Sequence, residues 1–397
     1  MKLIIRFFEK IKSYSPQIKR YSSVAFVVLT MLFTFVTCGH GEKPQITEPE
    51  PTTIEESPSP EQTPEPTPEP EPEPEPELEP EPEPEPEPPG PVNPLTGMPT
   101  DTDLTRNRPF AVMINNHSAS MPQHGVSNAD ITYEILVEGG ITRMMAVYQD
   151  ISDIGVIGSI RSARLYYVDI VQSYDAIYIF GGGSEQAYEA LRSRSITRMD
   201  GVAGPRAEIF YRDPNRPYTN SSEHTLFTSS ERIMRWLPTY GLRLDLDEGY
   251  ERALSFAEDG TPAGGGKAQD FAVSFSTYKT TSFSYHEDDG LYYLSQHGGA
   301  YVDGNDSSQM SVTNVLVLHT NVSNIPGDAW GRLSVRTTGT GSGYFICGGE
   351  YIEIEWSRAD DSSQYVYTLL DGSELVLGRG RSYICIISND STVDFGS

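Results

Sequence analysis

The sequence has 397 residues, of which 56 are Asp or Glu and 29 are Lys or Arg, so its net charge is −27. Beyond residue 91 there remain 38 acidic and 22 basic residues, a charge of −16, which argues against a nucleic-acid partner because phosphate binding needs a basic surface. The three cysteines have no spacing typical of a metal site, and we expect neither a metal nor a cofactor.

The first 37 residues indicate a secretory signal peptide, because basic residues precede an uncharged run from Tyr21 to Thr37. The apolar stretch from Val24 to Val36 is shorter than the roughly 20 residues of a membrane-spanning helix, which favours a cleaved signal. Cys38 then stands where a lipoprotein carries its diacylglycerol. We expect anchoring in the lipid bilayer through Cys38 at the extracytoplasmic face of the membrane. The alternative is an uncleaved signal anchor with an incidental cysteine.

Residues 38–92 are expected to form a disordered tether. Pro and Glu dominate this segment and alternate almost without interruption from Glu69 to Pro88. Such a composition cannot bury a core, whereas proline and mutually repelling carboxylates favour an extended chain. A rise of about 3.1 Å per residue would let the tether reach roughly 150 Å.

Residues 93–255 are expected to form an α/β domain with a mixed sheet. Apolar or alternating runs predict strands at 108–114, 130–138, 143–148 and 175–180. Helical spacing predicts helices at 162–174 and 184–191, with Ser184 able to cap the second.

Residues 268–390 are expected to form a smaller all-β sandwich or barrel-like domain, which makes the chain α+β overall. Short apolar runs separated by turn residues lie at 271–275, 291–294, 312–318, 351–356, 365–369 and 383–387. Cys347 and Cys385 lie within apolar stretches, where they can either form a disulfide or remain buried free thiols.

The densest group of polar residues lies in the first of these domains. It follows or faces predicted strands and comprises Asn115, Asn116, His117, Glu134, Glu138 and Arg143. Ligands of open α/β sheets often bind at the carboxyl ends of strands, where His117 could act as a base oriented by Glu138. The alternative is that Asn, His and Gly at a strand end are ordinary turn formers.

Arg161 and Arg164 precede a predicted helix, and the positive end of a helix attracts anions. They could hold a ligand carboxylate or phosphate, or they could pair with Glu134 or Glu138. The glycines before Ser184 lack a nucleotide-binding pattern. His224 could add a second imidazole to the group, but no ligand spacing supports a metal site.

Several segments in order carry a family resemblance. They are Asn93 to Gly97, Arg108 to His117, Glu138 to Arg143, Gly158 to Arg164, Gly181-Gly182, Gly341 to Gly343, Asp371-Gly372 and Gly378 to Ile387. Together they resemble the YerB-like lipoproteins of Gram-positive bacteria. The resemblance covers about Asn93 to Ser388 and implies a two-domain architecture and an envelope location rather than an activity. The chain departs from the family at Glu223-His224-Thr225, where Pro-His-Asn is usual.

Two functions remain open. The first is a membrane-anchored envelope protein that binds a cell-wall component, such as peptidoglycan, or another exported protein through this polar group. The alternative is a wall-active enzyme that cleaves glycan or peptide with Glu138 or Glu134 and His117. Residues i and i+4 of one strand lie about 13 Å apart, so Glu134 and Glu138 could not both flank one glycosidic bond.

Overall fold

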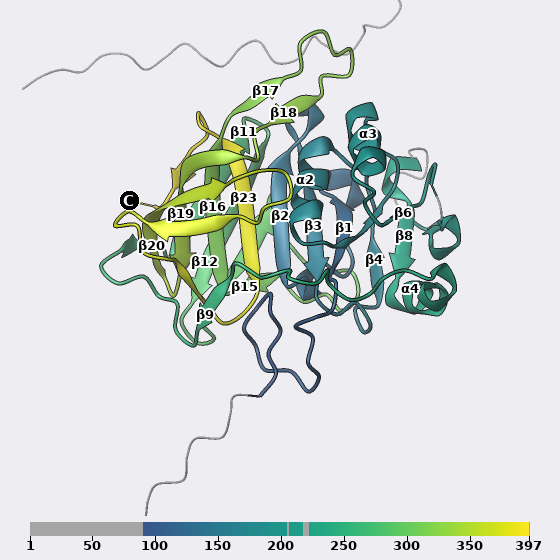
Figure 1. The fold of residues 1–397 in the computed structure, drawn as a ribbon. Coiled ribbons are helices and arrows are strands. Elements are labelled where there is room, and N and C mark those ends of the chain that lie inside the picture. The colour runs from purple at the N-terminus through teal and green to yellow at the C-terminus, as the bar shows by residue number, and fades with distance from the viewer. Residues whose placement is uncertain (1–89, 205, 217–221, 397) are drawn as a thin grey trace, which may run out of the picture. The chain divides into compact units, whose positions relative to one another are not determined.

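An eleven-stranded mixed sheet runs through both halves of the chain (Figure 1). The computed structural model describes residues 90–204, 206–216 and 222–396. The predicted signal peptide, Cys38 and nearly all of the predicted tether lie outside these residues. In spatial order the sheet contains β10 (Gly266–Lys267), β20 (Glu350–Arg358), β19 (Gly339–Cys347), β16 (Asn314–Thr320), β23 (Ser382–Ser388), β2 (Ile131–Leu136), β3 (Thr142–Tyr148), β1 (Phe110–Asn115), β5 (Ile177–Phe180) and β6 (Arg198–Asp200), and β21 (Val366–Leu369) pairs with β20.

The two halves meet where β2 pairs in parallel with β23, from Ile131 opposite Ser382 to Ile135 opposite Ile386. Almost every residue of both strands is buried, as is usual for strands covered on both faces. Strands β16, β19, β20 and β23 of the C-terminal half therefore continue the sheet of the first half. The mixed character of the sheet is confirmed.

A second sheet covers one face of the large sheet. Its strands are β14 (Gly299–Ala300), β13 (Leu291–Gln296), β12 (Lys279–His286), β11 (Asp270–Ser276) and β24 (Val393–Asp394), and β15 (Ser311–Val312) pairs with β13. Phe283 from this sheet packs in one hydrophobic core with Tyr383 of the C-terminal half and Met144 of the N-terminal half. The predicted sandwich thus exists in part, and its inner face includes strands from both halves.

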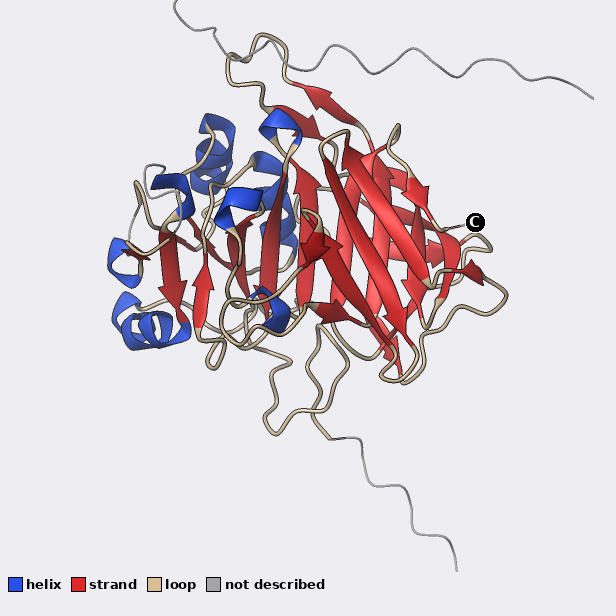
Figure 2. Cartoon of the chain, turned by 180° about the vertical axis from the view of Figure 1, so that it is seen from behind, coloured by secondary structure: helices blue, strands red, loops and turns tan. Residues whose placement is uncertain are grey.

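Helices cover the opposite face of the large sheet. Helix α2 (Leu165–Ser173) and helix α3 (Glu185–Ser193) contribute Tyr167, Val168 and Leu191 to a second core that also contains Trp356. Both helices agree with the predicted ranges, and Ser184 caps α3 by accepting a hydrogen bond from the Ala187 amide. Figures 1 and 2 show that the helices gather beside the N-terminal strands, whereas the far end of the sheet is almost entirely strand.

Smaller elements complete the described part of the fold. They are the three-stranded sheet of β4 (Val156–Gly158), β8 (Leu226–Ser229) and β7 (Tyr211–Arg212), the pairs β17 (Val322–Asn324) with β18 (Leu333–Val335) and β22 (Val376–Gly378) with β9 (Ser255–Ala257), and helix α4 (Ser230–Trp236).

The predicted strand at 130–138 is shorter than expected, because β2 ends at Leu136. Glu138 begins a 3-10 turn in which Gly139 has φ 76° and Gly140 has φ 74°. Left-handed φ values of this kind favour glycine and break an extended strand. Glu134 and Glu138 therefore do not share one strand face.

Cys347 and Cys385 are buried free thiols, and they lie in the two different cores that flank the large sheet. A disulfide between them would have to pass through the sheet. We predict that iodoacetamide labels both thiols after unfolding without a reductant, as measured by peptide mass spectrometry. Labelling that requires prior reduction would show a disulfide instead.

Candidate functional site

The polar segments named above meet at the carboxyl end of β1. Backbone contacts hold the chain after β4 against this strand, because the Arg161 amide donates to the Met113 carbonyl at 3.0 Å. The Gly181 amide, just after β5, donates to the Arg161 carbonyl at 3.0 Å. Arg161 is thereby fixed between the ends of β1 and β5, and α2 begins four residues later.

Three guanidinium groups converge here, and we call Arg143, Arg161 and Arg164 the arginine cluster. Arg164 holds Glu138 through two bonds, with Nε to Oε1 at 2.5 Å and Nη2 to Oε2 at 2.9 Å. Arg143 Nη2 lies 3.5 Å from Glu138 Oε2, and Arg161 Nη2 lies 3.0 Å from Glu223 Oε2. Within the described residues, two carboxylates therefore form ion pairs with three guanidiniums.

The electrostatics of the cluster reflect this imbalance. Arg143 is only 4% exposed, and burial together with repulsion from Arg164 and Arg161 lowers its pKa well below the usual range. Burial alone would raise the pKa of Glu138, but the hydrogen bonds from Arg164 and the charge of Arg143 outweigh it and lower that pKa. The carboxylate stays ionised, and the cluster keeps an excess of positive charge.

Two imidazoles lie beside the arginines. The ring centroids of His117 and His224 are 5.3 Å apart, and Asn115 Nδ2 lies 2.9 Å from His224 Nδ1. Burial, with repulsion from Arg161 and His117, lowers the pKa of His224. His224 is thus neutral at pH 7 and can donate a hydrogen bond from Nε2, because Nδ1 accepts one from the Asn115 amide.

Asn116 and Glu134 lie on the other face of the sheet. Glu134 is fully buried, and its carboxylate accepts hydrogen bonds from Asn116, Thr142, Thr281 and Tyr383. Lys279 Nζ lies 3.0 Å from Glu134 Oε1. The structure therefore places these two predicted site residues in a buried network, where neither side chain is accessible to a ligand in the solvent.

A pocket of about 320 Å³ adjoins the arginine cluster, and we call it the helix pocket. It lies between the first turns of α2 and α3 and the β17–β18 hairpin, and its lining includes Arg164, Ser184, Tyr166 and Leu333. Arg332 of the hairpin donates to Gln186 of α3 at 3.3 Å, which ties the hairpin to the helix. Two predicted site residues, Arg164 and Ser184, thus line a pocket.

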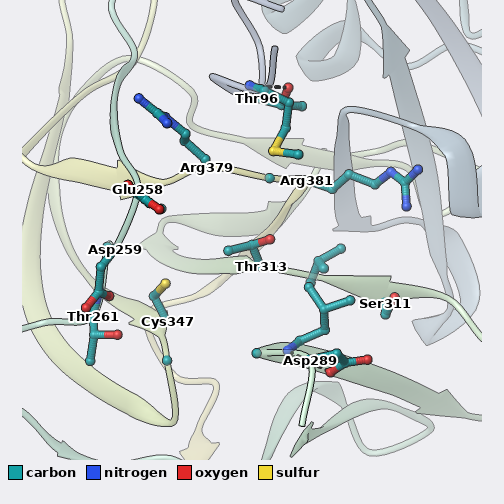
Figure 3. Close-up of a pocket in the computed structure, with 18 of the residues that line it drawn as sticks. Thr96, Glu258, Asp259, Thr261, Asp289, Ser311, Thr313, Cys347, Arg379 and Arg381 are labelled. Carbon is teal, nitrogen blue, oxygen red and sulfur yellow. Dashed lines mark hydrogen bonds between the residues drawn. The ribbon is translucent and has the colours of Figure 1, made fainter. Parts of the chain in front are cut away.

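A larger cavity of about 720 Å³ was not foreseen, and we call it the large cavity (Figure 3). Its walls include residues 93–100, 258–261, 289–291, 311–313 and 378–381. Two segments that carry the family resemblance, Asn93 to Gly97 and Gly378 to Ile387, contribute to these walls. The sequence alone predicted no binding or catalytic residue in either segment. Asp130 also lines the cavity, and burial raises its pKa to about 6.

No group of three His, Cys, Asp or Glu side chains in residues 90–204, 206–216 and 222–396 is placed to hold a metal ion. In the same ranges no helix has the length and apolar character needed to cross a membrane. The proposed lipid site at Cys38 lies outside them.

Comparisons with known proteins agree with this architecture. Residues 95–243 match the N-terminal domain of a protein family of unknown function, DUF3048, and residues 271–384 match its C-terminal domain. "Putative lipoprotein YerB" of Bacillus subtilis (strain 168) is 28% identical over 297 residues, which cover 74% of this chain and 85% of that protein. The crystal structure of Bacillus subtilis YerB superposes with a TM-score of 0.66 at 26% identity, and the match covers 76% of this chain and 99% of the other.

Proposed function

Because the chain belongs to the DUF3048 family and is homologous to YerB, we propose that it is a lipoprotein held in the cell envelope by Cys38. The signal-like segment before Cys38 and the Pro- and Glu-rich segment after it support this assignment. Anchoring at the extracytoplasmic face would place the folded body within reach of the cell wall.

The folded body binds an anionic group of a wall component through the arginine cluster. The observation that carries this proposal is that three guanidiniums, one of them almost fully buried, pair with only two carboxylates. Guanidinium groups suit carboxylates and phosphates because their donors match two acceptor oxygens at once. A bound anion would relieve the repulsion that lowers the pKa of Arg143.

The helix pocket accommodates the uncharged part of such a ligand. Arg164 belongs to the cluster and also lines this pocket, so the charged and uncharged parts of one ligand could be held side by side. Tyr166, Leu333 and Pro326 supply apolar surface, whereas Ser184 and Asn324 supply polar groups. A few polar groups within an apolar lining are typical of ligand pockets.

The enzymatic alternative receives less support from the same geometry. Glycan cleavage needs two carboxyl groups that face one bond, but Glu134 is fully buried on the second-sheet face. Glu138 points to the opposite side and is held by Arg164. This pair therefore offers no acid and base to a common substrate.

Co-sedimentation with purified cell walls tests the proposal. We expect the full-length protein to pellet with protein-free walls at low salt and to be released by sulfate, because this anion competes for the guanidinium groups. Walls stripped of phosphate polymers by acid distinguish the two anions, since binding that persists assigns a peptide carboxylate and binding that is lost assigns a phosphate.

Arg161→Gln is the informative variant, because the ion-pair partner of Arg161 among the described residues is the largely exposed Glu223. We expect it to reduce pelleting at least about tenfold, which corresponds to roughly 1.4 kcal/mol. Arg192→Gln removes an equal charge from an exposed position on α3 and serves as the control. If the protein stays in the supernatant with every wall preparation, the wall is not the partner, and an exported protein takes its place.

A further inference from the structure

The large cavity lies at the other end of the strands from the arginine cluster. Parallel strands β16 and β23 begin side by side, with Asn314 opposite Ser382, and cavity residues 311–313 and 378–381 come immediately before them. The arginine cluster lies at the carboxyl end of β1. Strand β1 runs in the same direction as β23, because β23 is parallel to β2 and both β1 and β2 are antiparallel to β3. The two sites are therefore separate.

Buried hydrogen bonds fix the wall of the cavity that carries two arginines. Asn314, which is fully buried, donates to the Gly378 carbonyl at 2.7 Å and accepts from the Gly378 amide at 2.9 Å. The Gly380 amide donates to the Thr96 carbonyl at 2.8 Å, and the Thr313 amide donates to the Arg381 carbonyl at 3.0 Å. The segment from Gly378 to Arg381 is thus held on both sides.

The close approach of the backbone to Thr313 explains why residue 380 in this wall is a glycine. Gly380 has φ 138°, and a Cβ atom there would lie 1.9 Å from Thr313 Oγ1. No other residue fits without moving Thr313, which itself lines the cavity. A cavity whose wall is fixed before a ligand arrives loses less entropy on binding.

Charges of both signs line the cavity. Figure 3 shows Arg379 and Arg381 on the side near Thr96, with Asp259 and Asp289 on the opposite side and Glu258 between them. Arg379 and Arg381 are exposed, and within the described ranges neither forms an ion pair. Arg381 nevertheless lies near Asp130 of the same lining, because burial raises the pKa of that carboxyl and the charge of Arg381 partly offsets the rise. Asp259 accepts a hydrogen bond from the Thr261 amide, and Asp289 accepts one from the Leu291 amide and one from the Tyr293 hydroxyl, yet a carboxylate has about four acceptor sites.

We infer that the large cavity binds a short zwitterionic peptide, with its carboxylate at Arg379 and Arg381 and its ammonium group at Glu258, Asp259 and Asp289. The volume of about 720 Å³ falls within the roughly 300–1,000 Å³ of small-ligand sites. Hydroxyl groups of Thr261, Ser311 and Thr313 line the cavity and can bond the peptide groups. This site is independent of the proposed wall-binding site.

Calorimetric titration of the full-length protein with four matched peptides tests the inference. The peptides are trialanine, N-acetyl-trialanine, trialanine amide and N-acetyl-trialanine amide, which carry both charges, only the carboxylate, only the ammonium group, and neither. We expect trialanine to bind with one site per chain and each single cap to weaken binding at least about tenfold. Absence of trialanine binding, or equal binding of all four peptides, would overturn the inference.

Variants assign the charges to their residues. Arg379→Gln with Arg381→Gln should abolish the preference for a free carboxylate, whereas Glu258→Gln should weaken only the preference for a free amine. These side chains are exposed, so an unchanged melting temperature confirms folding. Arg161→Gln should leave trialanine binding intact, which separates this inference from the wall-binding proposal. Unchanged peptide preference in the double Arg variant would contradict it.

Discussion

Lys279→Met is expected to destabilise the protein by about 3–5 kcal/mol, because it leaves the charge of Glu134 buried without its counter-ion. Both side chains are almost completely buried, at 2% exposure for Lys279 and 0% for Glu134, and their charged atoms lie 3.0 Å apart. Lys279 belongs to β12 of the second sheet and Glu134 to β2 of the large sheet. The ion pair therefore joins the two layers across the two halves of the sequence.

Urea unfolding of the wild type, both single variants and the double variant Glu134→Gln/Lys279→Met measures this coupling. The double variant should recover much of the loss, because replacing a whole buried ion pair is far less costly than removing one partner. Hydrogen bonds and the Lys279 charge outweigh burial and lower the pKa of Glu134 from its ordinary value of 4.5. Its stabilising contribution should thus be present above about pH 4.5 and be lost as the pH falls further. Additive effects of the two substitutions would contradict the pairing.

Glu138→Gln is expected to destabilise the protein by about 3 kcal/mol, because it removes the carboxylate that Arg143 and Arg164 share. Arg143 is 4% exposed, and among its described side-chain contacts it would keep the hydrogen bond to the Ser162 carbonyl at 3.0 Å. The three guanidiniums would then have Glu223 as their remaining described carboxylate partner. The free energy of unfolding of this variant should therefore increase more than that of the wild type when an anion binds in the cluster.

Unfolding in sulfate and in chloride at equal ionic strength reveals this sensitivity. A ligand that binds only the folded state stabilises it by RT ln(1 + [L]/Kd), so sulfate should stabilise Glu138→Gln more than the wild type. Glu189→Gln, an exposed substitution on α3, controls for a general salt effect. Equal stabilisation of all three proteins would show that the cluster does not take up an anion.

Helices α2 and α3 and strands β1, β2, β3 and β5 of the N-terminal half could be predicted, because their periodicity depends on local burial. Helix α4 and the short strands β4 and β6 to β9 were not predicted. The apolar runs at 351–356 and 383–387 correspond to β20 and β23. The parallel pairing of β2 with β23 could not be predicted, since it joins residues about 250 positions apart and no spacing records such a contact. This pairing places strands from both halves of the sequence in one sheet.

The candidate site was predicted in part for a related reason. Arg161 and Arg164 were recognised by their position before a helix, and the pairing of Arg164 with Glu138 was one of the stated alternatives. Lys279 was missed because a lysine beside a turn suggests a surface residue, and only the partner on β2 explains its burial. The large cavity was missed because separate segments far apart in the sequence form it.

Calorimetric titration of the full-length protein with soluble wall fragments tests the central claim, binding of a wall anion at the arginine cluster, most directly. The fragments are a peptidoglycan disaccharide-peptide with free carboxylates and a glycerol phosphate oligomer. We predict that one of them binds with one site per chain, and that Arg161→Gln weakens this binding at least about tenfold while Arg192→Gln does not. Failure of both fragments to bind, or equal affinity in wild type and Arg161→Gln, would contradict the account.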